Sequence, residues 1–168
     1  LGERVLFVQN KLKTQDIQVN KEKKNLTLIK NAKPSSFENS LTSLSFLKRE
    51  RQKWKIHTAQ MHSSPAIKKR TAFLEGGENH LEFSEGKKKK TSLFTESVLK
   101  QKRAVEINEE DLKSILCLIE GVKIAPYLPK EGSPQLLITS FALEKKPPSE
   151  TGDRNYTLQM ELIKRDKK

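Results

Sequence analysis

The positive charge of this chain is concentrated in its first two thirds. Residues 1–60 contain 13 Lys and Arg against 5 Asp and Glu, and residues 61–105 contain 10 against 5. Residues 106–168 are balanced, with 10 against 11. Because like charges repel one another and resist burial, a cationic segment must be neutralised or remain hydrated. The asymmetry therefore predicts a loose, solvated front and a final third that can pack.

The low hydrophobic content of the chain also predicts that much of it does not pack into a core. Hydrophobic residues make up 34% of the chain and charged residues 32%, whereas a typical soluble domain is about 45–50% apolar when glycine is counted. Such a composition does not offset the entropy lost on ordering. We therefore predict a mostly disordered basic chain with a small α+β C-terminal module, namely one short helix plus a two-strand hairpin, and an isolated amphipathic helix near residues 41–57.

The predicted organisation has three parts. Residues 1–60 form a basic region with short strand-like segments and the amphipathic helix. Residues 61–105 form a disordered basic linker, and residues 106–168 form the helix–hairpin module. The chain starts at Leu1 without an initiator Met or a signal-peptide pattern, so we expect the numbering to begin inside a longer product or after processing.

The clearest local signals lie in the last part. Asn108 is a favourable N-cap before three acidic residues, and Gly121 stands where a helix would end, which predicts a helix between them. Residues 156–163 alternate apolar and polar side chains, as a half-buried strand does. Residues 136–143 are rich in β-prone types and predict a second strand. The side chains expected on one face of that strand are Leu137, Thr139, Phe141 and Leu143.

A module of this size is marginal by itself. We therefore expect a protein partner, self-association or further chain to complete it. Strand addition to an exposed sheet edge is the obvious route.

The helix near residues 41–57 combines apolar anchors with basic surroundings. Leu44, Leu47, Arg51 and Trp54 follow a spacing of three to four residues, which places the apolar anchors Leu44, Leu47 and Trp54 on one face. Such a helix suits an acidic groove such as that of calmodulin, a membrane surface or a phosphate backbone. The alternative is that it packs Trp54 on a neighbouring surface of the same chain.

Basic clusters mark the predicted linker. Lys87, Lys88, Lys89 and Lys90 resemble a nuclear-import signal, which presents extended lysines to acidic pockets. The other cationic side chains could neutralise phosphates without reading sequence, because no aromatic residues are interleaved with them for base stacking. These candidate polyanion-binding residues are Lys68, Lys69, Arg70, Lys100, Lys102 and Arg103.

Two serines in this region are candidate phosphorylation sites. Ser64 precedes Pro65, and Ser92 follows the lysine run. Added negative charge at either would locally weaken polyanion binding.

The segment Arg4-Val5-Leu6-Phe7 resembles the R-V-x-F docking peptide of protein phosphatase 1 regulators. The resemblance implies that Arg4, Val5 and Phe7 dock on a sheet edge of that phosphatase. Residues 114–117 are similar to a second docking motif of the same regulators, but Cys117 replaces its basic residue. An ordinary strand is the alternative for residues 4–7.

Residue patterns of known catalytic and cofactor sites are missing from the sequence. There is no phosphate-binding loop, nucleophile elbow or dinucleotide fingerprint. A single cysteine, Cys117, lies among aliphatic residues and is expected to be buried and inert. The three histidines lack neighbouring thiols, so no metal site is expected. No apolar run is long enough for a membrane span. We therefore expect neither an enzyme nor a cofactor, and no small-molecule substrate.

The favoured functional hypothesis is a non-enzymatic nuclear adaptor or scaffold. Its basic region would bind chromatin or RNA as a polyanion, and its C-terminal module would bind a protein partner. The alternative is a cytosolic or cytoskeletal regulatory protein that binds calmodulin, protein phosphatase 1 or microtubules.

Overall fold

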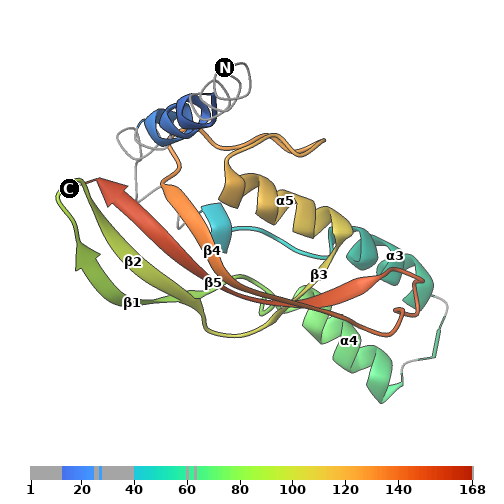
Figure 1. Cartoon of the computed structure of the whole chain (residues 1–168). Helices are drawn as coiled ribbons and strands as arrows, with labels where there is room; N and C mark the ends of the chain where they lie inside the picture. Colours follow the sequence, from blue (N-terminus) through green and yellow to red (C-terminus); the bar gives the residue numbers. More distant parts are fainter. Residues whose placement is uncertain (1–12, 25–26, 28–39, 60, 63, 168) are drawn as a thin grey trace.

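The computed structural model describes residues 13–24, 27, 40–59, 61–62 and 64–167. Three labelled helices accompany a five-stranded antiparallel sheet in this part of the chain (Figure 1). Their bounds are α3 Lys48–Thr58, α4 Pro65–Glu75, β1 Phe83–Lys90, β2 Phe94–Gln101, β3 Val105–Asn108, α5 Glu109–Glu120, β4 Gln135–Lys145 and β5 Asn155–Lys167. Residues 13–24 are also helical, and residues 40–42 form one helical turn.

The long strand β5 organises the sheet. One edge of β5 pairs with β3 through its first residues and with β2 through its last ones, and its other edge pairs with β4. β1 lies outside β2, so β1 and β4 are the opposite edges of the sheet. α5 crosses one face, while α3 and α4 lie together at the end of the sheet away from the β1–β2 turn (Figure 1).

Helix α5 confirms its sequence prediction. The Asn108 side chain accepts a hydrogen bond from the Asp111 backbone N–H, and the Asp111 carboxylate accepts one from the Asn108 N–H. This reciprocal pair is a capping box. At the other end Gly121 adopts the left-handed conformation, with φ 62°, which glycine reaches without a steric penalty. The Cys117 thiol is buried, as predicted.

The β4–β5 hairpin is also confirmed, but the prediction of one apolar face on β4 is wrong. A bulge between Ile138 and Ser140 shifts the register. Leu137 therefore pairs with Ile163, whereas Phe141 pairs with Met160 on the opposite face of the sheet. Since a one-residue shift reverses the side-chain direction, Leu137 and Phe141 cannot share a face.

The core contradicts the predicted fold class. Leu41, Phe46, Trp54, Leu74 and Leu81, all from the basic front, are buried in one cluster with the tail residues of α5 and β5. The chain is thus a compact α+β fold and not a mostly disordered chain with a small C-terminal module. The apolar side chains are sparse along the sequence, but they are enough to form a core because they converge on one interior. Carboxylates that are distant in the sequence pair with the cations buried there and neutralise them. The tail members of the cluster are Ile107, Ile115, Ile119, Leu136, Leu158, Met160 and Leu162.

The predicted linker and the predicted amphipathic helix also need correction. Residues 61–105 are not a linker, since they contain α4, β1 and β2. The helix predicted near residues 41–57 starts only at Lys48, because Leu47 adopts the left-handed conformation (φ 57°) and interrupts it. The Leu47 N–H donates to the Asp111 carboxylate at 2.9 Å, which ties this break to α5.

Near the N-terminus, part of the strand-like pattern is helical. Ile17 and Val19 alternate with polar residues and belong to the region predicted to contain short strand-like segments, but they lie in the helix of residues 13–24 and are exposed. The other strand-like segments of this region are two short runs rich in apolar residues, at residues 5–8 and 26–29. The first lies outside the described residues, as does the second except for residue 27.

Candidate functional site

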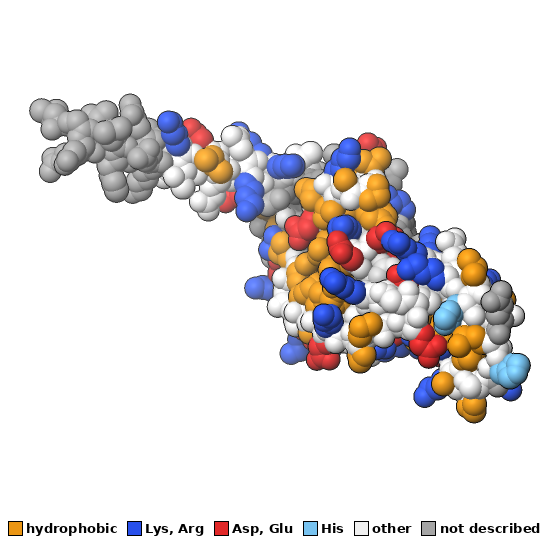
Figure 2. Space-filling model, turned by 90° about the vertical axis from the view of Figure 1, so that its right-hand side faces the viewer, with side chains coloured by type: hydrophobic (Ala, Val, Ile, Leu, Met, Phe, Trp, Pro, Cys, Tyr) orange, Lys and Arg blue, Asp and Glu red, His pale blue; other side chains and the backbone are white. Residues whose placement is uncertain are grey.

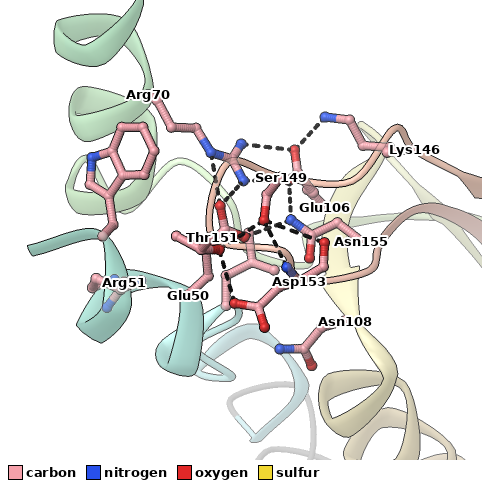
Figure 3. A network of polar contacts seen from close by, with 12 residues as sticks. Glu50, Arg51, Arg70, Glu106, Asn108, Lys146, Ser149, Thr151, Asp153 and Asn155 are labelled. Carbon is pink, nitrogen blue, oxygen red and sulfur yellow. Dashed lines mark hydrogen bonds and ion pairs between the residues drawn. The ribbon is translucent and has the colours of Figure 1, made fainter. Parts of the chain in front are cut away.

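A buried polar cluster joins four parts of the fold (Figure 3). We call it the Arg70 network. Arg70 of α4 donates to the carboxylates of Glu50 in α3 and Glu106 in β3, with the shortest contact to each at 2.6 Å. Its members are Glu50, Arg70, Glu106, Lys146 and Asn155.

Each carboxylate in this network has several donors. The Asn155 side-chain amide at the start of β5 donates to Glu50 at 2.6 Å and to Glu106 at 2.9 Å. Lys146, just after β4, forms an ion pair with Glu106. Burial raises the pKa of the Glu106 carboxyl, but the hydrogen bonds from Arg70 and Lys146 outweigh it and hold that pKa below its ordinary value. Burial lowers the pKa of Arg70, and the bonds to Glu106 and Glu50 more than reverse this.

The geometry of the network suits a structural role. Glu50 is 0% exposed and Glu106 7%, and their oxygens are occupied by protein donors. None of the network residues lines the small cavity of about 120 Å³ between residues 44–47 and the end of α4. A carboxylate that transfers protons must reach a substrate. We therefore assign the network to the joining of α3, α4, β3 and the β4–β5 connection.

The lowered pKa of Glu106 predicts an acid-dependent loss of stability. A carboxyl group whose pKa is lower in the folded state contributes stability above its unfolded value, about 4.5 for a glutamate, and loses it as the pH falls through the folded value. Urea unfolding of the wild type and of Glu106→Gln should therefore converge between pH 6 and pH 2.5. Glu131→Gln, at an exposed position, serves as the control. A constant gap between wild type and Glu106→Gln over this range would contradict the assigned ion pairs.

The predicted polyanion-binding residues fall into two groups in the structure, those paired with carboxylates and those exposed on a helix. Arg70 is an internal partner of two carboxylates, so its assignment as a polyanion-binding residue is wrong. Lys102 and Arg103 pair with Glu82, and Lys100 pairs with Glu161 at 2.9 Å. Lys68 and Lys69 are exposed on α4. Seen from the α3–α4 end, the surface shows Lys and Arg interleaved with Asp and Glu instead of one basic field (Figure 2).

The lysine run has a definite place in the fold. Lys87, Lys88, Lys89 and Lys90 form the second half of the edge strand β1, and all four are exposed. We call these residues the lysine edge. Lys88 pairs with Glu85 at 2.8 Å. Lys89 lies opposite Glu96 of β2, but Glu96 binds Arg165 instead, at 2.8 Å. No salt bridge to Lys87, Lys89 or Lys90 is formed by any residue that the structure describes.

The predicted helix anchors belong to the core. Leu47 is 1% exposed and Trp54 4%, and the Trp54 indole N–H donates to the Thr71 hydroxyl of α4 at 2.8 Å. Leu44 is partly buried against the same cluster. The prediction that these three side chains are free to bind a partner is therefore wrong. The alternative reading, packing on a neighbouring surface of the chain, is the one observed.

The remaining sequence candidates lie at turns or outside the described residues. The Ser64 hydroxyl caps α4 by accepting a hydrogen bond from the Ile67 N–H at 3.3 Å. Ser92 is exposed in the β1–β2 turn. Phosphorylation of either serine stays a prediction. Arg4, Val5 and Phe7, the proposed phosphatase-docking residues, lie outside the residues described.

The sequence analysis did not predict two features of the structure. The Arg70 network escaped notice because its members are far apart in sequence and none belongs to a local motif. The second is the outer half of β4, where Phe141 is 39% exposed and Leu143 37%. Both had been assigned to an apolar strand face, and the alternating pattern alone does not reveal which strand lies at an edge.

Comparison with known proteins adds no assignment, since no family model, curated protein or solved structure matches this chain. Within the described ranges, no three His, Cys, Asp or Glu side chains are grouped so that they could hold a metal ion. None of the helices described there has the length and apolar character required to cross a membrane.

Proposed function

We propose that this chain is a non-enzymatic binding domain that engages nucleic acid as a polyanion through the lysine edge. One observation carries the proposal. Lys87, Lys89 and Lys90 of β1 are exposed without a carboxylate partner among the described residues. By contrast Lys100 of β2, Lys102 just after it and Arg70 are paired with acids. The net charge of +12 supplies long-range attraction to the same class of partner.

Binding of this kind is independent of base sequence. Lysines that neutralise phosphates release condensed counterions, which gives affinity but no base readout. Phe94, at the start of the neighbouring strand β2, is already covered, since the Arg165 guanidinium carbon lies 4.9 Å from its ring centroid. The partner is therefore recognised by its charge, as expected for chromatin or RNA. Nuclear import through the lysine edge stays a prediction.

The test compares two double variants that remove equal charge. Lys89→Gln/Lys90→Gln changes the lysine edge, and Lys68→Gln/Lys69→Gln changes α4 at the other end of the sheet (Figure 1). Binding of a 20-base-pair DNA duplex of arbitrary sequence is measured by fluorescence anisotropy over a series of salt concentrations. Since each phosphate contact contributes about 0.9 to the slope of log K against log salt, the first variant should reduce the magnitude of that slope by up to about 1.8.

The α4 variant should retain the wild-type slope. If both variants weaken binding equally, the affinity follows net charge alone and the lysine edge is not the site. If the wild type does not bind the duplex at low salt, the proposed function is wrong.

A further inference from the structure

The outer half of β4 is an unprotected sheet edge. Its last seven residues, 139–145, are all exposed, whereas its first four are buried or partly buried. The inner edge of the same strand pairs with β5. In the described part of the chain no strand pairs with the outer edge. A long edge with exposed apolar side chains is a template for another strand.

The two edges of the sheet are protected very differently. β1 carries the lysine edge and a register shift between Glu85 and Lys88, both of which discourage pairing with a further strand. The exposed run of β4 has only Glu144 and Lys145 as charged residues, at its end. The outer side of β3 is covered, because the Asn79 side chain bonds both the N–H and the C=O of Glu106. An incoming strand is therefore accepted on the β4 side.

The exposed run is complementary to itself. Its central residue is Ala142, so an antiparallel copy related by a two-fold axis through Ala142 pairs residue n with residue 284 − n. In this register Phe141 lies opposite Leu143 of the second copy, and Leu143 opposite its Phe141. Both pairs are on the sheet face of Met160 and Leu158, because cross-strand partners share a face.

The other face of the same pairing is equally compatible. Ala142 meets Ala142, whose small side chain permits close approach, and Ser140 meets Glu144 of the second copy. On the face of Phe141 and Leu143, Lys145 lies opposite Thr139, so no like charges face one another on either face. Moving the axis to residue 143 places Phe141 opposite Lys145. Moving it to Phe141 places Glu144 opposite the partly buried Ile138. The central register is thus favoured over its neighbours.

We propose that two copies of this chain associate through antiparallel pairing of their β4 edges, centred on Ala142, to form one continuous sheet. The contact is isologous, and the lysine edges at the far sides prevent growth into a fibre. β1 and β4 are opposite edges, so the association does not depend on nucleic-acid binding. A β strand of another protein is the competing occupant of the edge.

Cysteine cross-linking of the full chain tests both the edge and the register. Opposite residues of an antiparallel pair have Cα atoms about 4.5–5.5 Å apart, within the range of a disulfide. Ala142→Cys should therefore form a disulfide dimer on mild oxidation. Ser140→Cys, on the same face of the same strand, should not, because its opposite residue is Glu144. The native Cys117 is buried and does not compete.

Sedimentation equilibrium of the unmodified chain provides the second readout. The mass should rise with concentration from 19.3 kDa toward twice that value, and Leu143→Glu should abolish the rise. Because each copy carries +12, added salt should strengthen the dimer by screening repulsion, the opposite of its effect on nucleic-acid binding. A monomer at every concentration and salt level, or cross-linking of Ser140→Cys as efficient as that of Ala142→Cys, would overturn the proposal and leave the lysine edge untouched.

Discussion

Replacing Arg70 with methionine should lower the free energy of unfolding by about 3–5 kcal/mol, the cost of removing one partner from a buried ion pair. Methionine retains the apolar stem of the side chain but leaves Glu50, which is 0% exposed, with only the Asn155 amide as a side-chain donor among the described residues. Glu106 keeps the donors Lys146 and Asn155 but loses the two hydrogen bonds from the Arg70 guanidinium. The measurement is urea unfolding followed by circular dichroism at neutral pH.

Two further variants separate the lost charge pairing from lost packing. Arg103→Met removes a surface partner of Glu82 and should cost no more than about 1 kcal/mol. Adding Glu50→Gln to Arg70→Met should recover part of the loss, because the uncompensated buried charge is removed with its partner. If Arg70→Met is as mild as Arg103→Met, the network does not hold the four parts of the fold together.

Trp54→Ala should lower the free energy of unfolding by about 3–5 kcal/mol. The indole is 4% exposed and lies in the same cluster as β5 residues, so its removal leaves a cavity in the shared core. The matched control on the same helix is Ile56→Ala. Ile56 is 77% exposed, and its truncation should change stability by less than about 0.5 kcal/mol.

Features that depend on local chemistry were predictable from the sequence. The N-cap Asn108 and the terminal Gly121 set the ends of α5 through interactions within a few residues. The alternation along β5 was equally readable, because Leu158, Met160 and Leu162 all face the core. Both elements lie in the balanced final third, where local pattern and tertiary structure agree.

The packing of the basic front was not predictable from charge and composition. Its cations were expected to keep it hydrated, but Arg70 is neutralised by Glu106, which lies 36 residues away, and Asn155 meets Glu50 across 105 residues. No window of the sequence contains both members of such a pair. The left-handed Leu47 and the bulge at Thr139 were hidden for the same reason, since tertiary contacts and not local preference favour them.

Hydrogen exchange of Trp54→Ala is the most direct measurement of whether the basic front and the tail share one interior. The exchange free energies of the β5 amides at Leu158, Met160 and Leu162 should fall by the same amount as those of α4, because one cooperative unit loses stability as a whole. Wild-type protection retained in β5 and α5, with loss confined to α3 and α4, would show that the front folds separately and would contradict the single core.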